Sequence, residues 1–130
     1  MLLDTSGLLC LHHKAEPLHE KAREFYQASP VRLTNNYVLA EYIALATVRR
    51  LPRQATLTFV VDLLGNPAIE VVWVDEALND RAMNLLLERQ DKSYSLCDAV
   101  SFTLMRQYGV DEALTTDRHF EQEGFRRLLV

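Results

Sequence analysis

Residues 1–11, MLLDTSGLLCL, place an apolar segment, a polar segment and a second apolar segment in immediate succession. Residues 1–3 suit a short buried strand, and the polar residues 4–7 offer side chains that can cap a helix. The apolar run of leucines that follows then forms one face of this helix. The chain is therefore predicted to start as a strand that leads directly into a helix.

The same alternation of strand and helix continues along the chain. Apolar and β-branched runs predict further strands at 31–34, 69–74, 113–117 and 125–130. Helical periodicity predicts helices at 16–28, 35–50, 52–64, 75–90 and 95–108, with a short helical turn before the last strand. Because successive parallel strands need crossover connections, this order predicts an α/β fold with a largely parallel sheet. No linker or repeat interrupts the pattern, so residues 1–130 are expected to form one domain.

The composition is that of an ordinary globular protein, with 48% hydrophobic and 25% charged residues in a chain of 130, and it excludes a disordered chain. No apolar run approaches the roughly 18 residues of a membrane span, and the first residues lack the order of a signal peptide. We therefore expect a cytoplasmic protein without a membrane segment. Cys10 and Cys97 form no C-x-x-C pair, so buried free thiols are expected.

The formal net charge of −4 at first argues against a nucleic-acid partner, because phosphate binding usually requires a basic surface. The inference changes if several acids bind metal. Two divalent cations held by four carboxylates would bring the sum to zero and leave the basic residues free to face phosphates. Net charge alone does not decide the question.

Three aspartates are predicted to lie at one edge of the sheet. Asp4 and Asp117 follow predicted strands, and ligands of open α/β sheets bind at the carboxyl ends of strands. Asp98 lies one turn into the helix that follows Ser95, near the same edge. A structural alternative exists for each of them, since aspartates at helix starts are commonly caps, and Ser95 with Asp98 fits a capping box.

Glu41 does not fit that alternative. It lies in the middle of a predicted helix with Val38 and Leu45 as neighbours on the apolar side, and this position predicts a half-buried carboxylate. The nearest arginines, Arg49 and Arg50, are about two turns away along the helix. A bound metal ion would supply the missing positive charge.

Four carboxylates in one pocket would repel one another without cations, and oxygen ligands favour hard ions such as Mg²⁺ or Mn²⁺. Zinc is not favoured, because no cysteine pair and no i, i+4 histidine pair is present. The histidines are His12, His13, His19 and His119, of which His12 and His13 are expected at the surface of a helix end.

Four stretches of the sequence carry a family resemblance. They are LLDTSGLL (2–9), LTNNYVLAEYIAL (33–45), YSLCDAVSFTLM (94–105) and ALTTDRHFEQEGF (113–125). In this order and at these separations they resemble PIN-domain proteins, specifically the VapC-like toxin ribonucleases, over nearly the whole chain. The first strand is unusually short for the family.

The resemblance implies a PIN-like three-layer α/β/α fold in which helices surround a central sheet of about four to five short strands. It also implies a Mg²⁺- or Mn²⁺-dependent endoribonuclease that hydrolyses RNA to leave a 5′-phosphate, with an antitoxin protein as partner and a homodimer as a common state. The implied catalytic residues and metal ligands are Asp4, Glu41, Asp98 and Asp117. The implied assisting residues are Thr5, Ser6, Thr116 and Asp91.

Contacts to RNA are expected from basic residues around the pocket, although each also suits a solvated helix end. The candidates are Lys14, Arg49, Arg50, Arg53 and Arg118. Tyr37, Tyr42 and Tyr94 could stack on bases, but tyrosines on helices more often belong to the core.

Several alternatives remain open. A haloacid-dehalogenase-like phosphatase would need Asp-x-Asp after the first strand, where this chain has Asp4-Thr5-Ser6, and a receiver domain would need an acidic pair there. A PIN-like module could bind RNA or protein without cutting. In a purely structural α/β domain the aspartates would be caps, and Glu41 would remain unexplained.

Overall fold

The computed structural model describes all residues from 1 to 130, and five strands alternate with seven helices along the chain. Every predicted element is present, but the strands are shorter than predicted. In chain order the elements are β1 (Leu2–Leu3), α1 (Thr5–His12), α2 (His19–Ala28), β2 (Leu33–Asn35), α3 (Asn36–Val48), α4 (Arg53–Leu64), β3 (Glu70–Val72), α5 (Glu76–Glu88), α6 (Leu96–Tyr108), β4 (Glu112–Leu114), α7 (His119–Gln122) and β5 (Arg126–Arg127).

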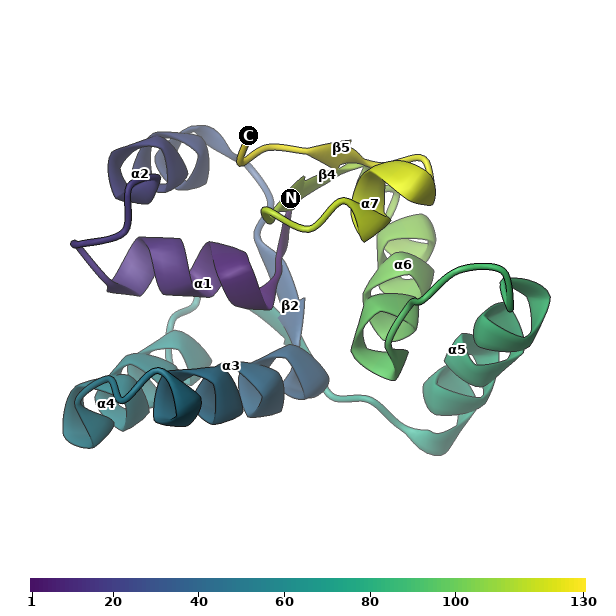
Figure 1. Ribbon diagram of the computed structural model, residues 1–130, viewed down its shortest axis with the longest axis horizontal. Helices are drawn as coiled ribbons and strands as arrows, with labels where there is room; N and C mark the ends of the chain where they lie inside the picture. The colour runs from purple at the N-terminus through teal and green to yellow at the C-terminus, as the bar shows by residue number, and fades with distance from the viewer.

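The five strands form one sheet in the order β3-β2-β1-β4-β5, and every neighbouring pair is parallel. The prediction of four to five short, largely parallel strands is therefore confirmed. The first strand, β1, lies at the centre of the sheet between β2 and β4 (Figure 1). None of the helices has both the length and the apolar character of a membrane span.

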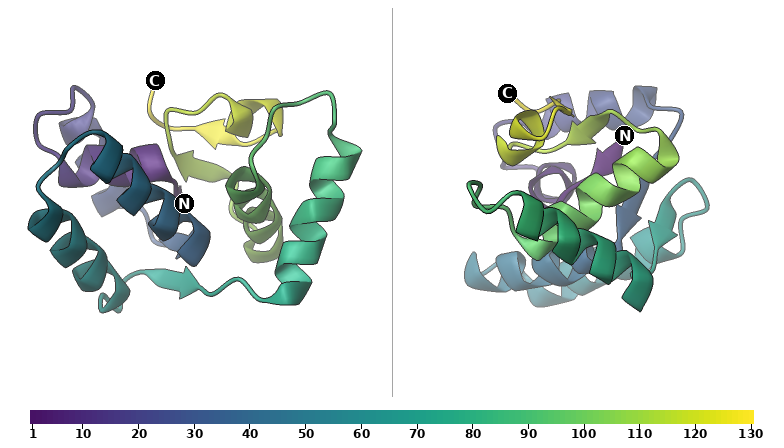
Figure 2. Two further views of the ribbon diagram at one scale, coloured as in Figure 1. Left: turned by 60° about the horizontal axis from the view of Figure 1, so that its bottom comes forward. Right: turned by 90° about the vertical axis from the view of Figure 1, so that its right-hand side faces the viewer.

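The two residues of β1 explain the layered architecture. Side chains alternate between the faces of a strand, and Leu3 packs into one hydrophobic cluster whereas Leu2 packs into the other. The Leu3 cluster joins the sheet to α1–α4, and the Leu2 cluster joins it to α5–α7. Figures 1 and 2 show these two groups of helices on opposite sides of the strands, so the α/β/α prediction is confirmed.

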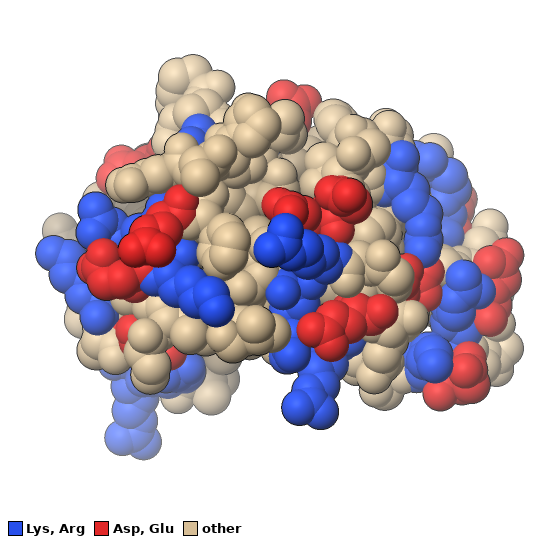
Figure 3. Space-filling model, turned by 90° about the horizontal axis from the view of Figure 1, so that it is seen from above, with Lys and Arg blue, Asp and Glu red and all other residues tan.

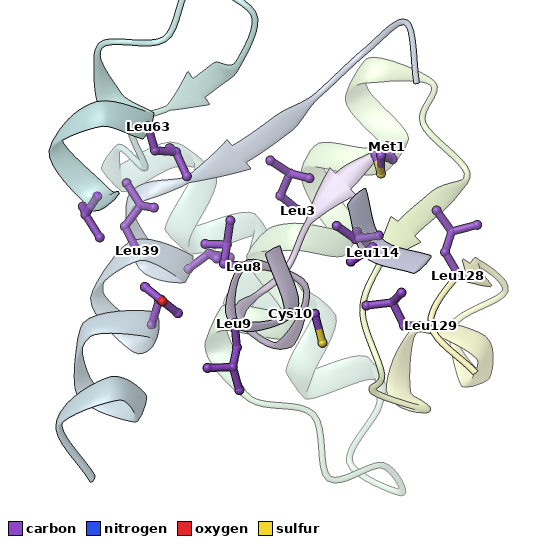
Figure 4. Packing of buried hydrophobic residues seen from close by; sticks show 14 residues of the cluster. Met1, Leu3, Leu8, Leu9, Cys10, Leu39, Leu63, Leu114, Leu128 and Leu129 are labelled. Atoms are coloured by element: carbon purple, nitrogen blue, oxygen red, sulfur yellow. The ribbon is translucent and has the colours of Figure 1, made fainter. Parts of the chain in front are cut away.

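Gly7 allows α1 to pack closely against the sheet. A Cβ atom at this position would lie 2.0 Å from the backbone oxygen of Leu114 in β4, a distance at which the backbone would have to move. In Figure 4, Leu8 and Leu9 of α1 lie between Leu39 of α3 and the Leu114 side of the cluster. The glycine thus brings the start of α1 and the end of β4 together, and both carry predicted site residues.

Candidate active site

The carboxyl edge of the sheet brings the predicted acids together. Leu3 pairs with Leu114, which places Asp4 beside Thr115 where both strands end. Asp4, Glu41 and Asp117 line one pocket, together with Thr5, Ser6, Leu45 and Thr116. Asp98, in the first turn of α6, has a carboxylate oxygen within 4.8 Å of one from Asp117. Asp4, Glu41 and Asp117 therefore share one pocket, and Asp98 joins them through Asp117; the side chains close enough to share one ion are Asp98, Asp117 and His119. We refer to the four acids as the acidic cluster.

Asp4 is buried, with 5% of its surface exposed. It precedes α1 but its side chain makes no capping hydrogen bond, so the capping alternative is wrong for this residue. The Thr115 hydroxyl donates a hydrogen bond of 2.8 Å to Asp4 Oδ2. Burial raises the pKa of Asp4 to about 7 against the effect of this bond, and the nearby Asp98 and Glu41 raise it further.

Asp98 does act as a cap, as the structural alternative predicted. The Ser95 hydroxyl accepts a hydrogen bond from the Asp98 backbone, and Asp98 Oδ2 accepts one from the Ser95 backbone, each at 3.0 Å. The same oxygen also accepts a hydrogen bond of 2.9 Å from His119 Nδ1. A carboxylate has two oxygens, so capping through one of them leaves the other available.

Asp117 is more exposed, with 38% of its side chain accessible. Its Oδ1 accepts a hydrogen bond of 2.9 Å from the His119 backbone, and its own backbone N–H donates to the Thr115 hydroxyl at 3.0 Å. Asp117 therefore closes the turn that leads into α7 while its carboxylate borders the pocket.

The prediction of a half-buried carboxylate at Glu41 was wrong, because the residue is exposed. Glu41 lies on the solvent flank of the apolar face of α3, next to Val38 and Tyr42, which are fully buried. An exposed glutamate needs no compensating charge, so the physical argument made for Glu41 from the sequence was wrong. Its place in the cluster depends instead on its position in the pocket.

The predicted hydroxyl residues also lie at this edge. Ser6 accepts a hydrogen bond of 2.9 Å from the Thr116 backbone and lies 3.2 Å from the Thr115 hydroxyl. Thr5 is buried beside the pocket, and its Oγ1 has no hydrogen-bond partner. Asp91 is exposed, pairs with Lys92 at 3.6 Å and does not line this pocket, so its assisting role stays a prediction.

Three residues of the cluster were missed from the sequence. His119 contacts both Asp98 and Asp117, and Thr115 contacts Asp4. Burial raises the pKa of the Cys97 thiol, and Glu41, Asp4 and Asp98 raise it further. His119 stands in the stretch ALTTDRHFEQEGF (113–125), and Cys97 precedes Asp98, so their sequence positions were available signals. Thr115 could be found only through the register of β1 and β4.

The predicted RNA contacts lie at two distances from the pocket. Arg118 is exposed next to Asp117. Four others lie near the far ends of α1 and α3, since Glu41 and Arg49 are separated by about 12 Å of helix; they are Lys14, Arg49, Arg50 and Arg53. Arg49 already pairs with Glu16 at 2.7 Å. On the face in Figure 3, basic and acidic side chains are interleaved rather than segregated.

The aromatic and thiol predictions have mixed outcomes. Tyr42 and Tyr94 are 0% and 8% exposed, so both belong to the core and are not free to stack on bases. Both cysteines are free, but only Cys10 is buried, whereas Cys97 is partly accessible. The prediction of a simple surface position for His12 was wrong, because its ring stacks on Phe59 with centroids 4.4 Å apart.

Comparison with known proteins gives a consistent result. Residues 1–125 match the family model described as PIN domain. The chain is 30% identical over 126 residues to the 23S rRNA-specific endonuclease VapC20 of Mycobacterium tuberculosis, covering 96% of this chain and 95% of that protein. It is 32% identical over 122 residues to ribonuclease VapC26 of the same species, covering 92% and 89%.

A solved structure agrees with the sequence comparison. The crystal structure of M. tuberculosis VapC20, described as a toxin that cleaves the sarcin-ricin loop, superposes with a TM-score of 0.85 at 29% identity. The match covers 95% of each chain. The similarity therefore extends over the whole sheet and both helical layers.

Proposed function

Because this chain belongs to the PIN-domain family, we propose that it is a nuclease that cleaves RNA internally with the help of a divalent cation. The curated relatives are named as an endonuclease and a ribonuclease. The residues that we propose as metal ligands and catalytic groups are Asp4, Glu41, Asp98 and Asp117.

The observation that carries the proposal is the buried carboxylate of Asp4. No lysine or arginine pairs with it, and a hydroxyl is its side-chain hydrogen-bond donor. Burial raises its pKa to about 7, which means that the negative form is poorly compensated by the protein alone. A cation held between Asp4 and the neighbouring acids would supply this compensation. The unpartnered Thr5 hydroxyl adds another oxygen at the same pocket.

The donor set suits a hard cation. Carboxylate and hydroxyl oxygens favour Mg²⁺ or Mn²⁺. When bound, such an ion polarises a phosphate and lowers the pKa of a coordinated water. The four carboxylates would hold such an ion at the edge of the sheet, and without it they would repel the phosphates of RNA. The site should therefore bind metal before it binds substrate.

We propose a folded ribosomal RNA segment as the substrate class, since VapC20 is named for 23S rRNA and its structure for the sarcin-ricin loop. Arg118 is our candidate for a contact to a phosphate next to the cleaved bond, because it is exposed and follows Asp117 directly in the chain. A cognate antitoxin, a homodimeric state and a cytoplasmic location are part of the same proposal by analogy with the toxin relatives.

The proposal is tested by incubating end-labelled sarcin-ricin-loop RNA and an unrelated stem-loop with purified protein in Mg²⁺, Mn²⁺ or excess EDTA. Asp98→Asn should keep its capping hydrogen bonds and lose at least about 100-fold in cleavage rate, because a metal ligand is lost. Asp75→Asn is the matched control. Asp75 caps α5 by accepting a 2.8 Å hydrogen bond from the Leu78 backbone. The Asp75→Asn variant should cleave RNA at the rate of the wild type.

Cleavage that survives in EDTA, or equal rates in Asp98→Asn and the wild type, would overturn the metal-dependent mechanism. If the folded protein cuts neither RNA and binds no metal, the acids are structural and the chain is a non-catalytic RNA- or protein-binding module. Metal binding without cleavage would instead overturn the assignment of these RNAs and point to another RNA as substrate.

A further inference from the structure

His119 lies within the acidic cluster, and it could act there as a metal ligand or as a support for one. One ring nitrogen lies within 4.8 Å of carboxylate oxygens of Asp98 and Asp117. Proximity alone does not separate the two roles. The hydrogen bonds made by each ring nitrogen distinguish a metal ligand from a residue that supports one.

Both ring nitrogens of His119 are already engaged. Nδ1 lies 2.9 Å from Asp98 Oδ2, and a carboxylate can only accept, so Nδ1 carries the proton. Its lone pair is then unavailable to a metal. Nε2 lies 3.1 Å from the hydroxyl of Ser93, an exposed residue of the loop before α6. In this arrangement the hydroxyl donates to Nε2, and neither nitrogen is offered to the pocket.

The hydrogen bond from His119 reaches only one of the two carboxylate oxygens of Asp98. Oδ2 accepts from the Ser95 backbone and from His119, and no hydrogen bond to Oδ1 is present. Two donors on a single oxygen fix the orientation of the carboxylate plane. They leave Oδ1 as the oxygen that can bind a cation.

The position of His119 is itself well supported. Its backbone N–H donates to Asp117 Oδ1 at 2.9 Å, and its ring meets Tyr94 edge-on, with centroids 5.3 Å apart. The next residue, Phe120, is fully buried. The imidazole is therefore held where it can orient Asp98.

We propose that His119 is a positioning residue that donates from Nδ1 to Asp98 and directs Asp98 Oδ1 toward the cation, and that His119 is not a metal ligand. The inference rests on the metal site of the proposed function. It adds that Asp98 Oδ2 accepts the hydrogen bonds from the protein and that Asp98 Oδ1 binds the cation. Partners that orient a metal-binding carboxylate typically contribute about 10–100-fold to metal affinity.

Three substitutions separate the two roles. The amide N–H of His119→Asn can lie near the position of Nδ1, whereas that of His119→Gln lies nearer the position of Nε2. His119→Ala removes both. Metal binding is measured by calorimetry with Mn²⁺ and with Ni²⁺, because an imidazole ligand favours Ni²⁺ more strongly. Urea unfolding in EDTA checks that each variant is folded.

If His119 positions Asp98, the alanine and glutamine variants should lose about 10–100-fold in affinity for both ions, and the asparagine variant should stay within a few-fold of the wild type. A loss confined to Ni²⁺ would identify His119 as a ligand and overturn the proposal. Equal affinity in all variants would overturn it as well.

A second measurement is independent of metal binding. In metal-free wild-type protein at pH 8, the ¹⁵N spectrum of the His119 ring, assigned by its absence in His119→Ala, should show the proton on Nδ1. A proton on Nε2 would refute the proposal. Wild-type protein that shows the Nδ1 tautomer but binds no divalent cation would instead refute the proposed function and leave His119 as a support of the capping box alone.

Discussion

Two carboxylates in this molecule are almost completely withdrawn from water, but their surroundings are opposite. The Glu123 side chain is 3% exposed, and its oxygens accept hydrogen bonds from Arg89, Tyr94 and Arg106. Asp4 is 5% exposed, and no basic side chain pairs with it. Burial would raise the pKa of both groups, yet the arginine hydrogen bonds lower that of Glu123, whereas the pKa of Asp4 rises to about 7.

The difference separates a carboxylate that is compensated within the chain from one that is not. Glu123 ties α7 to α6 and to the end of α5 with cations that the chain supplies itself. Asp4 lies beside other acids, and the chain supplies no cation to compensate its charge, which is why we propose it as a metal ligand. Buried acids without resident cations are therefore the ones to examine for metal binding in this fold.

The largest change in the free energy of unfolding is expected from Asp4→Asn in metal-free protein. The folded-state pKa of Asp4 is above its ordinary value of 3.8, so the folded protein binds more protons than the unfolded chain between about pH 4 and pH 7. This group therefore makes the protein less stable as pH rises through that window. The asparagine variant should be more stable than the wild type at pH 8, by up to about 4 kcal/mol.

Urea unfolding in EDTA at pH 5 and pH 8 measures this difference. Saturating Mn²⁺ provides the control, since an ion at 100 times its Kd stabilises the folded wild type by about 2.7 kcal/mol and should not stabilise the variant. A variant that is less stable than the wild type at pH 8 would contradict the view of Asp4 as an uncompensated charge.

A smaller change in the free energy of unfolding is expected from Gly7→Ala. This substitution disturbs the packing of α1 next to Asp4 and leaves the surroundings of Glu123 intact. The added Cβ would meet the Leu114 backbone, so α1 or β4 must shift, at a cost of roughly 1–3 kcal/mol. Gly65→Ala is the matched control, because its Cβ would find its nearest atom at 3.7 Å. Thermal unfolding of both variants provides the measurement, and equal stabilities would show that α1 is not tightly constrained.

The smallest effect is expected from Glu123→Gln, which weakens the hydrogen bonds to two partly exposed arginines and should cost about 1–2 kcal/mol at pH 7. Because the folded-state pKa of Glu123 is lowered, its contribution is present above the ordinary value of 4.5 and is lost as pH falls through the folded-state value. The difference between variant and wild type should therefore shrink in acid.

Glu112→Gln serves as the control for Glu123→Gln, since Glu112 forms an exposed pair with Arg126 and should matter little. Unfolding curves at pH 3 and pH 7 compare the two variants. A Glu123→Gln difference that persists unchanged at pH 3 would show that ionisation of Glu123 does not stabilise the fold.

Several features followed from the sequence because they depend on neighbours along the chain. The alternation of strand and helix predicted a parallel α/β fold, and the rule that ligands bind at strand ends placed Asp4 and Asp117 at one edge. Ser95 and Asp98, three residues apart, form the predicted capping box. The resemblance to PIN-domain ribonucleases gave the four acids a shared role and implied metal-dependent hydrolysis of RNA as the chemistry.

Other features failed or were missed because they depend on distant residues. Periodicity located Glu41 near an apolar face but did not decide on which flank of α3 it would be exposed. Asp91 was chosen for its place just before Tyr94 and Ser95 in the sequence, but it is exposed and does not line the pocket. The contact from Thr115 to Asp4 spans 111 residues, and that from His119 to Asp98 spans 21.

The sequence by itself determined the order of elements, the parallel sheet and the candidate acids, because local periodicity, capping and strand ends are encoded over a few residues. Only the tertiary structure decided which carboxylate is buried without a cation, which is paired with arginines, and which oxygen of Asp98 remains free. Desolvation and hydrogen-bond partnership depend on what packs against a group from all sides, and in this protein those neighbours come from the far end of the chain.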